Sequence, residues 1–112
     1  MVLKKIEWIR ASRRILRTFS KEARRQAGAE LQRVQEGKHP IDWRPMPSVG
    51  PGTIEIRIHE PYEHRVLYVA KFPEAIYVLW CFDKKRTKSP KMDLATARKA
   101  YAEMQRQRQE KR

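Results

Sequence analysis

Three short apolar runs between residues 53 and 83 constrain the fold of this chain more than any other feature. From Thr53 to His59, isoleucines alternate with polar residues, which is the period-two pattern of a strand with one buried face. A second run spans 65–70, and a third, 75–82, is almost wholly apolar, as expected for a central strand covered on both faces. Because the connections between the runs are short and contain proline, the pattern predicts an antiparallel meander of three strands.

Helical patterns precede this predicted sheet. We expect a first strand over residues 4–9 and a short helix over 12–18. A second helix is predicted from Ser20, whose side chain suits an N-cap, to Gly37, with apolar residues repeating at helical spacing along one face. The two helices are expected to form an antiparallel hairpin that packs on the sheet.

The segments on either side of the meander are also distinctive. Residues 39–52 hold four prolines and are predicted to be a loop, with Trp43 packed at the edge of the core. After the meander, apolar residues recur at spacings of three and four, which predicts an amphipathic helix beginning near Pro90 or Asp93. Residues 105–112 are low in complexity and are expected to form a mobile basic tail. Together these patterns indicate an α+β protein.

The formal net charge of +13 says most about the partners of this chain. Residues 1–37 hold ten Lys and Arg against four Asp and Glu, and residues 84–112 hold eleven against three, while the segment between them is near neutral. With 112 residues, 40% of them hydrophobic, the chain has the size and composition of a single domain over 1–112. Such a distribution predicts a polyanionic partner, nucleic acid first and a membrane surface as the lesser alternative.

Cysteine content and hydropathy narrow the cellular setting. Cys81 is the single cysteine, so no intramolecular disulfide can form, and its apolar neighbours indicate a small buried side chain. No apolar stretch approaches the roughly 20 residues that a membrane span needs. The N-terminus lacks the apolar core of a signal peptide. We therefore expect a cytoplasmic protein with no membrane among its partners, and a membrane surface stays only the lesser alternative for its basic charge.

Polar residues on one face of the predicted sheet are the candidates for chemistry. Glu55, Arg57 and His59 point away from the isoleucine side of their strand, and Arg65 opens the neighbouring strand. The loop after the third strand adds further cations, namely Lys84, Lys85, Arg86 and Lys88. Such a surface suits phosphates. It offers no cluster of metal ligands, so a metal-dependent nuclease is disfavoured and no cofactor is expected.

RNA can be cut without a metal ion because its own 2′-hydroxyl can attack the adjacent phosphate. An enzyme must then align the strand, remove one proton, protonate the leaving oxygen and stabilise the added negative charge. Arginine suits bidentate phosphate contacts, and lysine acts as a point charge. His59, Glu55 or a lysine could take the proton, and residue types alone leave that choice open.

Each of these features also has a plain structural interpretation. Arg57 and Arg65 could form surface ion pairs, and the basic run after residue 83 could be a solvated loop. His59 could be an ordinary surface residue, and Tyr62 could stack on a base or merely cover the turn.

A resemblance to a known family favours the functional interpretation. Residues 53–58, the Arg65-Val-Leu-Tyr segment, and the apolar strand that ends in Phe-Asp-Lys84-Lys85-Arg-Thr-Lys-Ser-Pro90 resemble the phage-derived, HigB-like branch of the RelE/ParE toxin superfamily. The segment Asp93-Leu-Ala-Thr-Ala-Arg-Lys99 fits the family helix that follows, so the similarity extends over about residues 49–104.

The resemblance implies a fold and an activity. The fold has two N-terminal helices packed on a small curved antiparallel sheet, with a C-terminal helix (RelE-like). The implied activity is that of a type II toxin, a metal-independent mRNA endoribonuclease that works on the ribosome and arrests translation. The implied partners are the ribosome, mRNA and a cognate helix-turn-helix antitoxin with an acidic segment, with operator DNA contacted only through the antitoxin.

The resemblance also implies roles for residues. By position, Arg57, Arg65, Lys84 and Lys85 would be the catalytic cations, with His59 a candidate for proton transfer. The expected RNA-binding residues are Arg86, Lys88, Lys91, Tyr62, Arg24 and Arg25. One departure from the family pattern is that Trp80-Cys81 stand where many members have His-Ala.

Two alternatives from other functional classes share these features. One is a ParE-like toxin that inhibits gyrase and cleaves nothing. The other is a non-catalytic RNA- or DNA-binding module, which a steep salt dependence of binding without cleavage would indicate.

Overall fold

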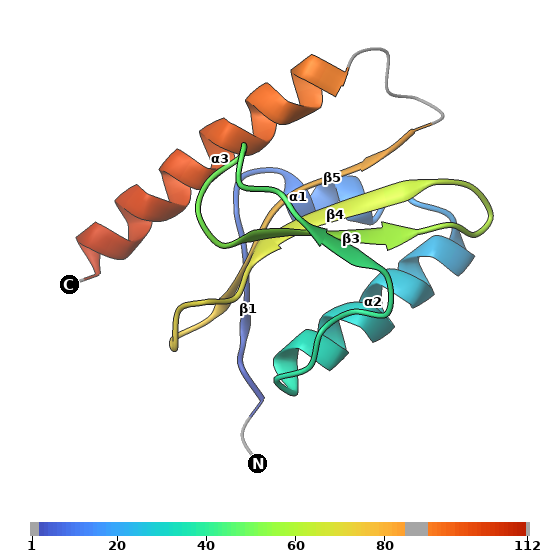
Figure 1. Cartoon of the computed structure of the whole chain (residues 1–112), viewed down its shortest axis with the longest axis horizontal. Helices are drawn as coiled ribbons and strands as arrows, with labels where there is room; N and C mark the ends of the chain where they lie inside the picture. The colour runs from blue at the N-terminus through green and yellow to red at the C-terminus, as the bar shows by residue number, and fades with distance from the viewer. Residues whose placement is uncertain (1–2, 85–89, 112) are drawn as a thin grey trace.

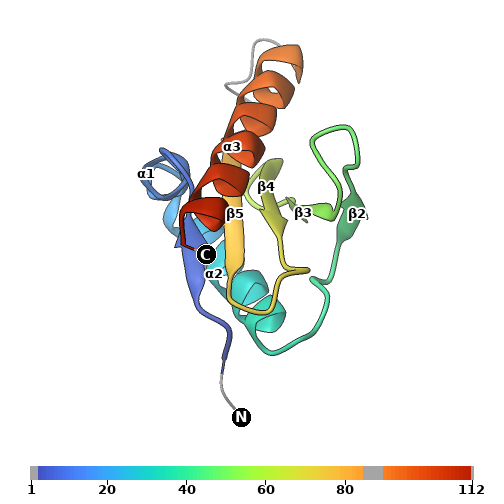
Figure 2. The same cartoon turned by 90° about the vertical axis from the view of Figure 1, so that its left-hand side faces the viewer.

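Residues 3–84 and 90–111 of the chain are described by a computed structural model and form three layers, with a five-stranded sheet between helices (Figure 1). The elements in chain order are β1 (Ile6–Trp8), α1 (Ser12–Leu16), α2 (Lys21–Gln35), β2 (Trp43–Pro45), β3 (Thr53–Ile58), β4 (His64–Val69), β5 (Ile76–Asp83) and α3 (Pro90–Glu110). The strands lie in the order β1-β5-β4-β3-β2, and Figure 2 shows α3 running along β5 on one face of this sheet. The α+β class is therefore confirmed.

The meander β3–β4–β5 confirms the predicted antiparallel core of the sheet. In β3 and β4, Arg57 pairs directly with Arg65, and in β4 and β5, Arg65 pairs with Phe82. The register between β4 and β5 shifts beside Leu67, as in a β-bulge, so that Leu79 and Trp80 both join the apolar cluster on the α3 side.

The sheet is mixed, and the expectation of a purely antiparallel sheet was wrong. Strand β1 pairs in parallel with β5, with Ile6 opposite Ile76, because the outer edge of the meander has free backbone groups that β1 satisfies in this direction. The paired helices also differ from the prediction. Helix α1 is only five residues long, and most of the sheet follows the helices in the chain.

The segment predicted as a loop contains the edge strand β2. Proline is tolerated there because an edge strand leaves half of its backbone groups without strand partners. Trp43 lies in this strand, is 37% exposed and stacks on His39 with ring centroids 4.3 Å apart, so it does not pack at the core edge as expected.

The ends of α2 agree with the sequence pattern. The Ser20 side chain accepts a hydrogen bond from the Ala23 backbone N–H at 3.2 Å, which is the predicted N-cap. Gly37 follows the helix with a φ of 86°, a backbone conformation that favours glycine at helix ends. The buried face of α2 is formed by small and branched residues: Ala23, Ala27, Leu31 and Val34.

Helix α3 continues to Glu110, into the segment expected to be mobile. Near this end the Arg108 guanidinium donates to the Glu74 carboxylate at 2.6 Å and lies 3.5 Å from the centroid of the Phe72 ring. Hydrogen bonds from Arg108 and Tyr77 lower the pKa of Glu74 to about 2. These contacts hold the last turns of α3 against the turn before β5.

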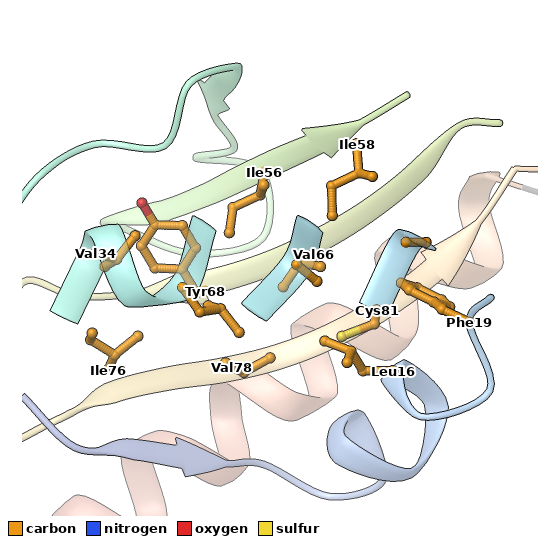
Figure 3. Close-up of a cluster of buried hydrophobic side chains, with 13 residues drawn as sticks. Leu16, Phe19, Val34, Ile56, Ile58, Val66, Tyr68, Ile76, Val78 and Cys81 are labelled. Atoms are coloured by element: carbon orange, nitrogen blue, oxygen red, sulfur yellow. The ribbon is translucent and has the colours of Figure 1, made fainter. Parts of the chain in front are cut away.

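Hydrophobic side chains fill both sides of the sheet. The cluster under α1 and α2 includes the isoleucine side of β3 and Cys81, whose burial raises the pKa of its thiol and confirms the expected buried cysteine (Figure 3). The cluster under α3 includes Leu67, Leu79 and Met104. No helix of the described part of the chain is both long and apolar enough to cross a membrane.

Close packing sets the position of α3 over the sheet. Tyr101 donates a hydrogen bond to the Pro51 carbonyl at 2.7 Å. A Cβ at Gly50 would lie 2.5 Å from the Tyr101 ring, so only glycine permits this approach. These contacts hold the middle of α3 against the segment that precedes β3.

Candidate functional site

A pocket of about 350 Å³ lies on the α3 side of the sheet, between the strands and the first turns of α3. It is lined by residues from four strands or their ends, the β2–β3 connection and α3: Arg44, Met46, Ser48, Glu55, Arg57, Leu67, Phe82, Lys84, Pro90, Asp93 and Leu94. This size is typical of a pocket that holds one small molecule or one unit of a polymer.

Three of the lining residues are cations that come from separate strands. Arg44 is exposed on β2, opposite Glu55 in the register. Arg57 lies further along β3 with a side chain that is 33% exposed. Lys84 follows β5, and its backbone N–H donates to the Glu63 carbonyl at 2.9 Å. An anion that enters the pocket therefore meets three positive side chains whose backbone positions are set by the sheet.

Glu55 lies between two guanidinium groups. Its Oε1 atom is 3.6 Å from Arg57 Nε and 3.6 Å from Arg65 Nε, and its side chain is only 9% exposed. Arg57 and Arg65 are direct cross-strand neighbours and would repel one another without a carboxylate between them. Glu55 thus allows two like charges to occupy adjacent strands.

Arg65 differs from Arg57 in its exposure. Only 5% of its side chain is exposed, and its Nη1 atom donates to Glu63 at 2.8 Å and to the His64 carbonyl at 3.0 Å. It does not line the pocket. The structure therefore brings Arg57, Arg65 and Glu55 together as predicted, but only Arg57 and Glu55 reach the pocket itself.

His59 lies beyond the end of β3 and outside the pocket lining. Its Nε2 atom is 2.5 Å from Asp42 Oδ2, and its Nδ1 atom is 2.6 Å from Glu63 Oε2. Hydrogen bonds to two carboxylates raise the pKa of His59 above its usual 6.5. The bond with Asp42 has the larger effect, and the bond with Glu63 has the smaller one. Two carboxylates that face both ring nitrogens stabilise the imidazolium form, and this form has no lone pair with which to accept a proton.

We expect the His59 pKa, measured by imidazole NMR, to lie above 6.5 in the folded protein and to fall in Asp42→Asn. Because folding raises this pKa, the stabilisation is complete below the unfolded-state pKa and is lost as pH rises through the folded-state pKa. It should amount to no more than about 1 kcal/mol, since the three side chains are exposed. A native pKa at or below 6.5, or one that Asp42→Asn leaves unchanged, would contradict the contact.

Residues 14–102 match the family of phage-derived Gp49-like proteins (DUF891). The chain belongs to this family. The Gp49-like proteins are a family of type II toxin–antitoxin toxins, which confirms the toxin class that the sequence resemblance predicted. The match includes every residue that lines the pocket. A search of curated proteins found no match.

The remaining predicted site residues of this Gp49-like chain, catalytic and RNA-binding, either are not among the residues that line the pocket or lie outside the described part. Tyr62 stacks on the buried His64, with ring centroids 4.6 Å apart, against the helix layer. Arg24 and Arg25 are exposed on α2, across the sheet from the pocket, and Lys91 is exposed in the first turn of α3. Lys85, Arg86 and Lys88 lie outside the described residues.

Sequence reasoning missed two features of the pocket. Arg44 was not predicted as a site residue because the prolines around it indicated a loop. The alternation across residues 43–45 was a weak signal of a strand. Asp93 was assigned no role, yet it lines the pocket and accepts a hydrogen bond from Trp80 Nε1 at 3.1 Å. The described residues contain no group of three or more His, Cys, Asp or Glu side chains that could hold a metal ion.

Proposed function

We propose that this chain is the toxin of a type II toxin–antitoxin system and that it cleaves mRNA on the ribosome without a metal ion. Membership of the Gp49-like family supports the toxin class. The observation that carries the chemistry is the pocket in which the Glu55 carboxylate lies beside Arg57 and shares the lining with Lys84. A carboxylate and fixed cations in one pocket are the groups that attack by a 2′-hydroxyl requires.

In this mechanism Arg57 binds the non-bridging oxygens of the scissile phosphate through the two terminal nitrogens of its guanidinium group. Glu55 takes the proton from the 2′-hydroxyl, whose oxygen then forms a bond to phosphorus. The bond from phosphorus to the 5′-oxygen breaks, and that oxygen receives a proton from the Lys84 ammonium. The products are a 2′,3′-cyclic phosphate and a free 5′-hydroxyl, so atoms and charges balance.

The same proposal assigns indirect roles to the other predicted residues. Arg65 orients Glu55 from beneath and does not contact the phosphate. His59 contributes to the structure at the end of β3 and does not transfer protons in the reaction.

The high positive charge supports a ribosomal target. Ribosomal RNA is a polyanion, and many dispersed Lys and Arg residues would anchor a small protein to its phosphates. In this proposal the protein works in the cytoplasm, and a helix-turn-helix antitoxin covers the pocket with an acidic segment. Operator DNA is contacted only through that antitoxin.

Primer extension on cellular mRNA after brief induction of the chain tests this function. We expect new 5′ ends within translated messages, and none in a matched message that lacks its start codon. Co-expression of the antitoxin should abolish them. Trapped gyrase–DNA complexes without new mRNA ends would instead identify the gyrase alternative, and binding without either effect would identify a non-catalytic module.

A further inference from the structure

Asp93 is one of two acidic residues, with Glu55, in a pocket that is also lined by three cations. It lies in the first turn of α3, and its Oδ1 atom accepts the hydrogen bond from Trp80 Nε1 at 3.1 Å. Its Oδ2 atom is buried and has no hydrogen-bond partner within the described part of the chain. A buried carboxylate oxygen without a donor is costly, so a donor is expected from water or from the ligand that fills the pocket.

The residues around Asp93 indicate which kind of ligand supplies the hydrogen-bond donor to Oδ2. Phe82, Leu67 and Leu94 contribute apolar surface to the same pocket, which suits a flat, weakly polar group. Arg57 and Lys84 line it as well and suit a phosphate. A ligand that carries a phosphate, a flat apolar face and N–H donors is a nucleotide. At about 350 Å³ the pocket suits a single unstacked nucleotide and is far too small for a duplex.

We propose that the pocket binds one unstacked guanine of the RNA, and that Asp93 recognises the Watson–Crick edge of this base. The inference rests on the proposed function only in taking RNA as the ligand. Trp80 acts as the positioning residue, because its indole N–H holds Oδ1 and leaves Oδ2 free to accept a hydrogen bond from the base.

Guanine is favoured because of how donors are arranged on the four bases. Its Watson–Crick edge presents two adjacent donors, the ring N1–H and the amino group. One can donate to the free Oδ2 atom, and the other to the second lone pair of Oδ1, whose first lone pair accepts from Trp80. Adenine and cytosine each present an amino group beside an unprotonated ring nitrogen that repels a carboxylate. Uracil presents one N–H between two carbonyls. The expected order of affinity is therefore guanine first and uracil last.

The sharpest test replaces Asp93 by asparagine in the full-length chain. In Asp93→Asn the side-chain oxygen can still accept from Trp80, while an NH₂ donor replaces the free acceptor, so shape is kept and one atom reverses its polarity. The chain is titrated with the 3′-monophosphates of guanosine, adenosine, cytidine and uridine, and the Trp80 indole N–H resonance, assigned with Trp80→Phe, is followed by NMR.

We expect the guanosine nucleotide to bind about tenfold or more tightly than the uridine nucleotide, to shift the Trp80 resonance, and to lose this preference in Asp93→Asn. Glu103→Gln is the matched control: it removes the same charge from α3 but lies outside the pocket, and it should keep the preference. Equal binding of all four nucleotides, or a guanine preference that survives in Asp93→Asn, would overturn the proposal and indicate that water alone satisfies Oδ2.

Cleavage and recognition can fail separately. If cellular mRNA is cut but the base distribution at the cut sites is the same for Asp93→Asn and for the parent, base recognition is wrong and the proposed function stands. If no mRNA is cut but guanosine binding depends on Asp93, the pocket is assigned correctly and the proposed reaction is wrong.

Discussion

Arg57→Ala is expected to reduce the single-turnover rate of mRNA cleavage on ribosomes by about 100- to 1000-fold, the usual loss when one preorganised charge-stabilising group is removed. Arg57 is the strand arginine that lines the pocket, and a third of its side chain is exposed there. The free energy of unfolding of Arg57→Ala should differ from that of the parent by roughly 1 kcal/mol or less, because a partly exposed ion pair contributes little to folding. The measurement is the cleavage rate on programmed ribosomes, together with urea unfolding of the same preparation.

Arg57→Lys is the matched variant for this prediction. Lysine keeps the positive charge but lacks the planar fork of N–H groups, so we expect only partial recovery of the rate. Recovery to the parental rate would show that charge alone is needed at this position. A parental rate in Arg57→Ala would contradict the assignment of Arg57 to the scissile phosphate.

Arg65→Ala is expected to show the opposite balance, with a large loss of stability. The Arg65 side chain is 5% exposed and is paired with both Glu55 and Glu63. Its removal leaves the buried Glu55 carboxylate with one cation and creates a void, which together should lower the free energy of unfolding by about 3 kcal/mol. Urea unfolding followed by tryptophan fluorescence measures this loss.

Two further variants separate the structural role of Arg65 from a direct chemical role. Arg65→Met combined with Glu55→Gln removes both buried charges and keeps side-chain volume, so it should recover most of the lost stability. Arg65→Met alone, assayed at a low temperature where it is folded, should cleave mRNA far faster than Arg57→Ala. A parental free energy of unfolding in Arg65→Ala would show that this arginine is not part of the buried network.

The local features of the fold could be predicted because they depend on nearby residues. Alternation from Thr53 to Ile58 follows from the geometry of a strand with one buried face. The cap at Ser20 depends on a side chain that bonds to a backbone N–H three residues away. The parallel pairing of β1 with β5 and the strand β2 could not be predicted in this way, because both depend on free backbone groups at the edges of a sheet formed by distant segments.

The candidate site shows the same division. That Glu55, Arg57 and Arg65 share one face of a strand pair could be predicted from the sequence, since alternation and the order of the strands are enough to place them there. The folded structure was needed to show that Arg57 lines a pocket while Arg65 is buried in ion pairs. It was also needed to show that Arg44 and Asp93 line this pocket and that Trp80 donates a hydrogen bond to Asp93. The physical reason is that exposure and partner choice depend on how α3 and β2 pack on the sheet, and residue types in a linear chain do not contain that information.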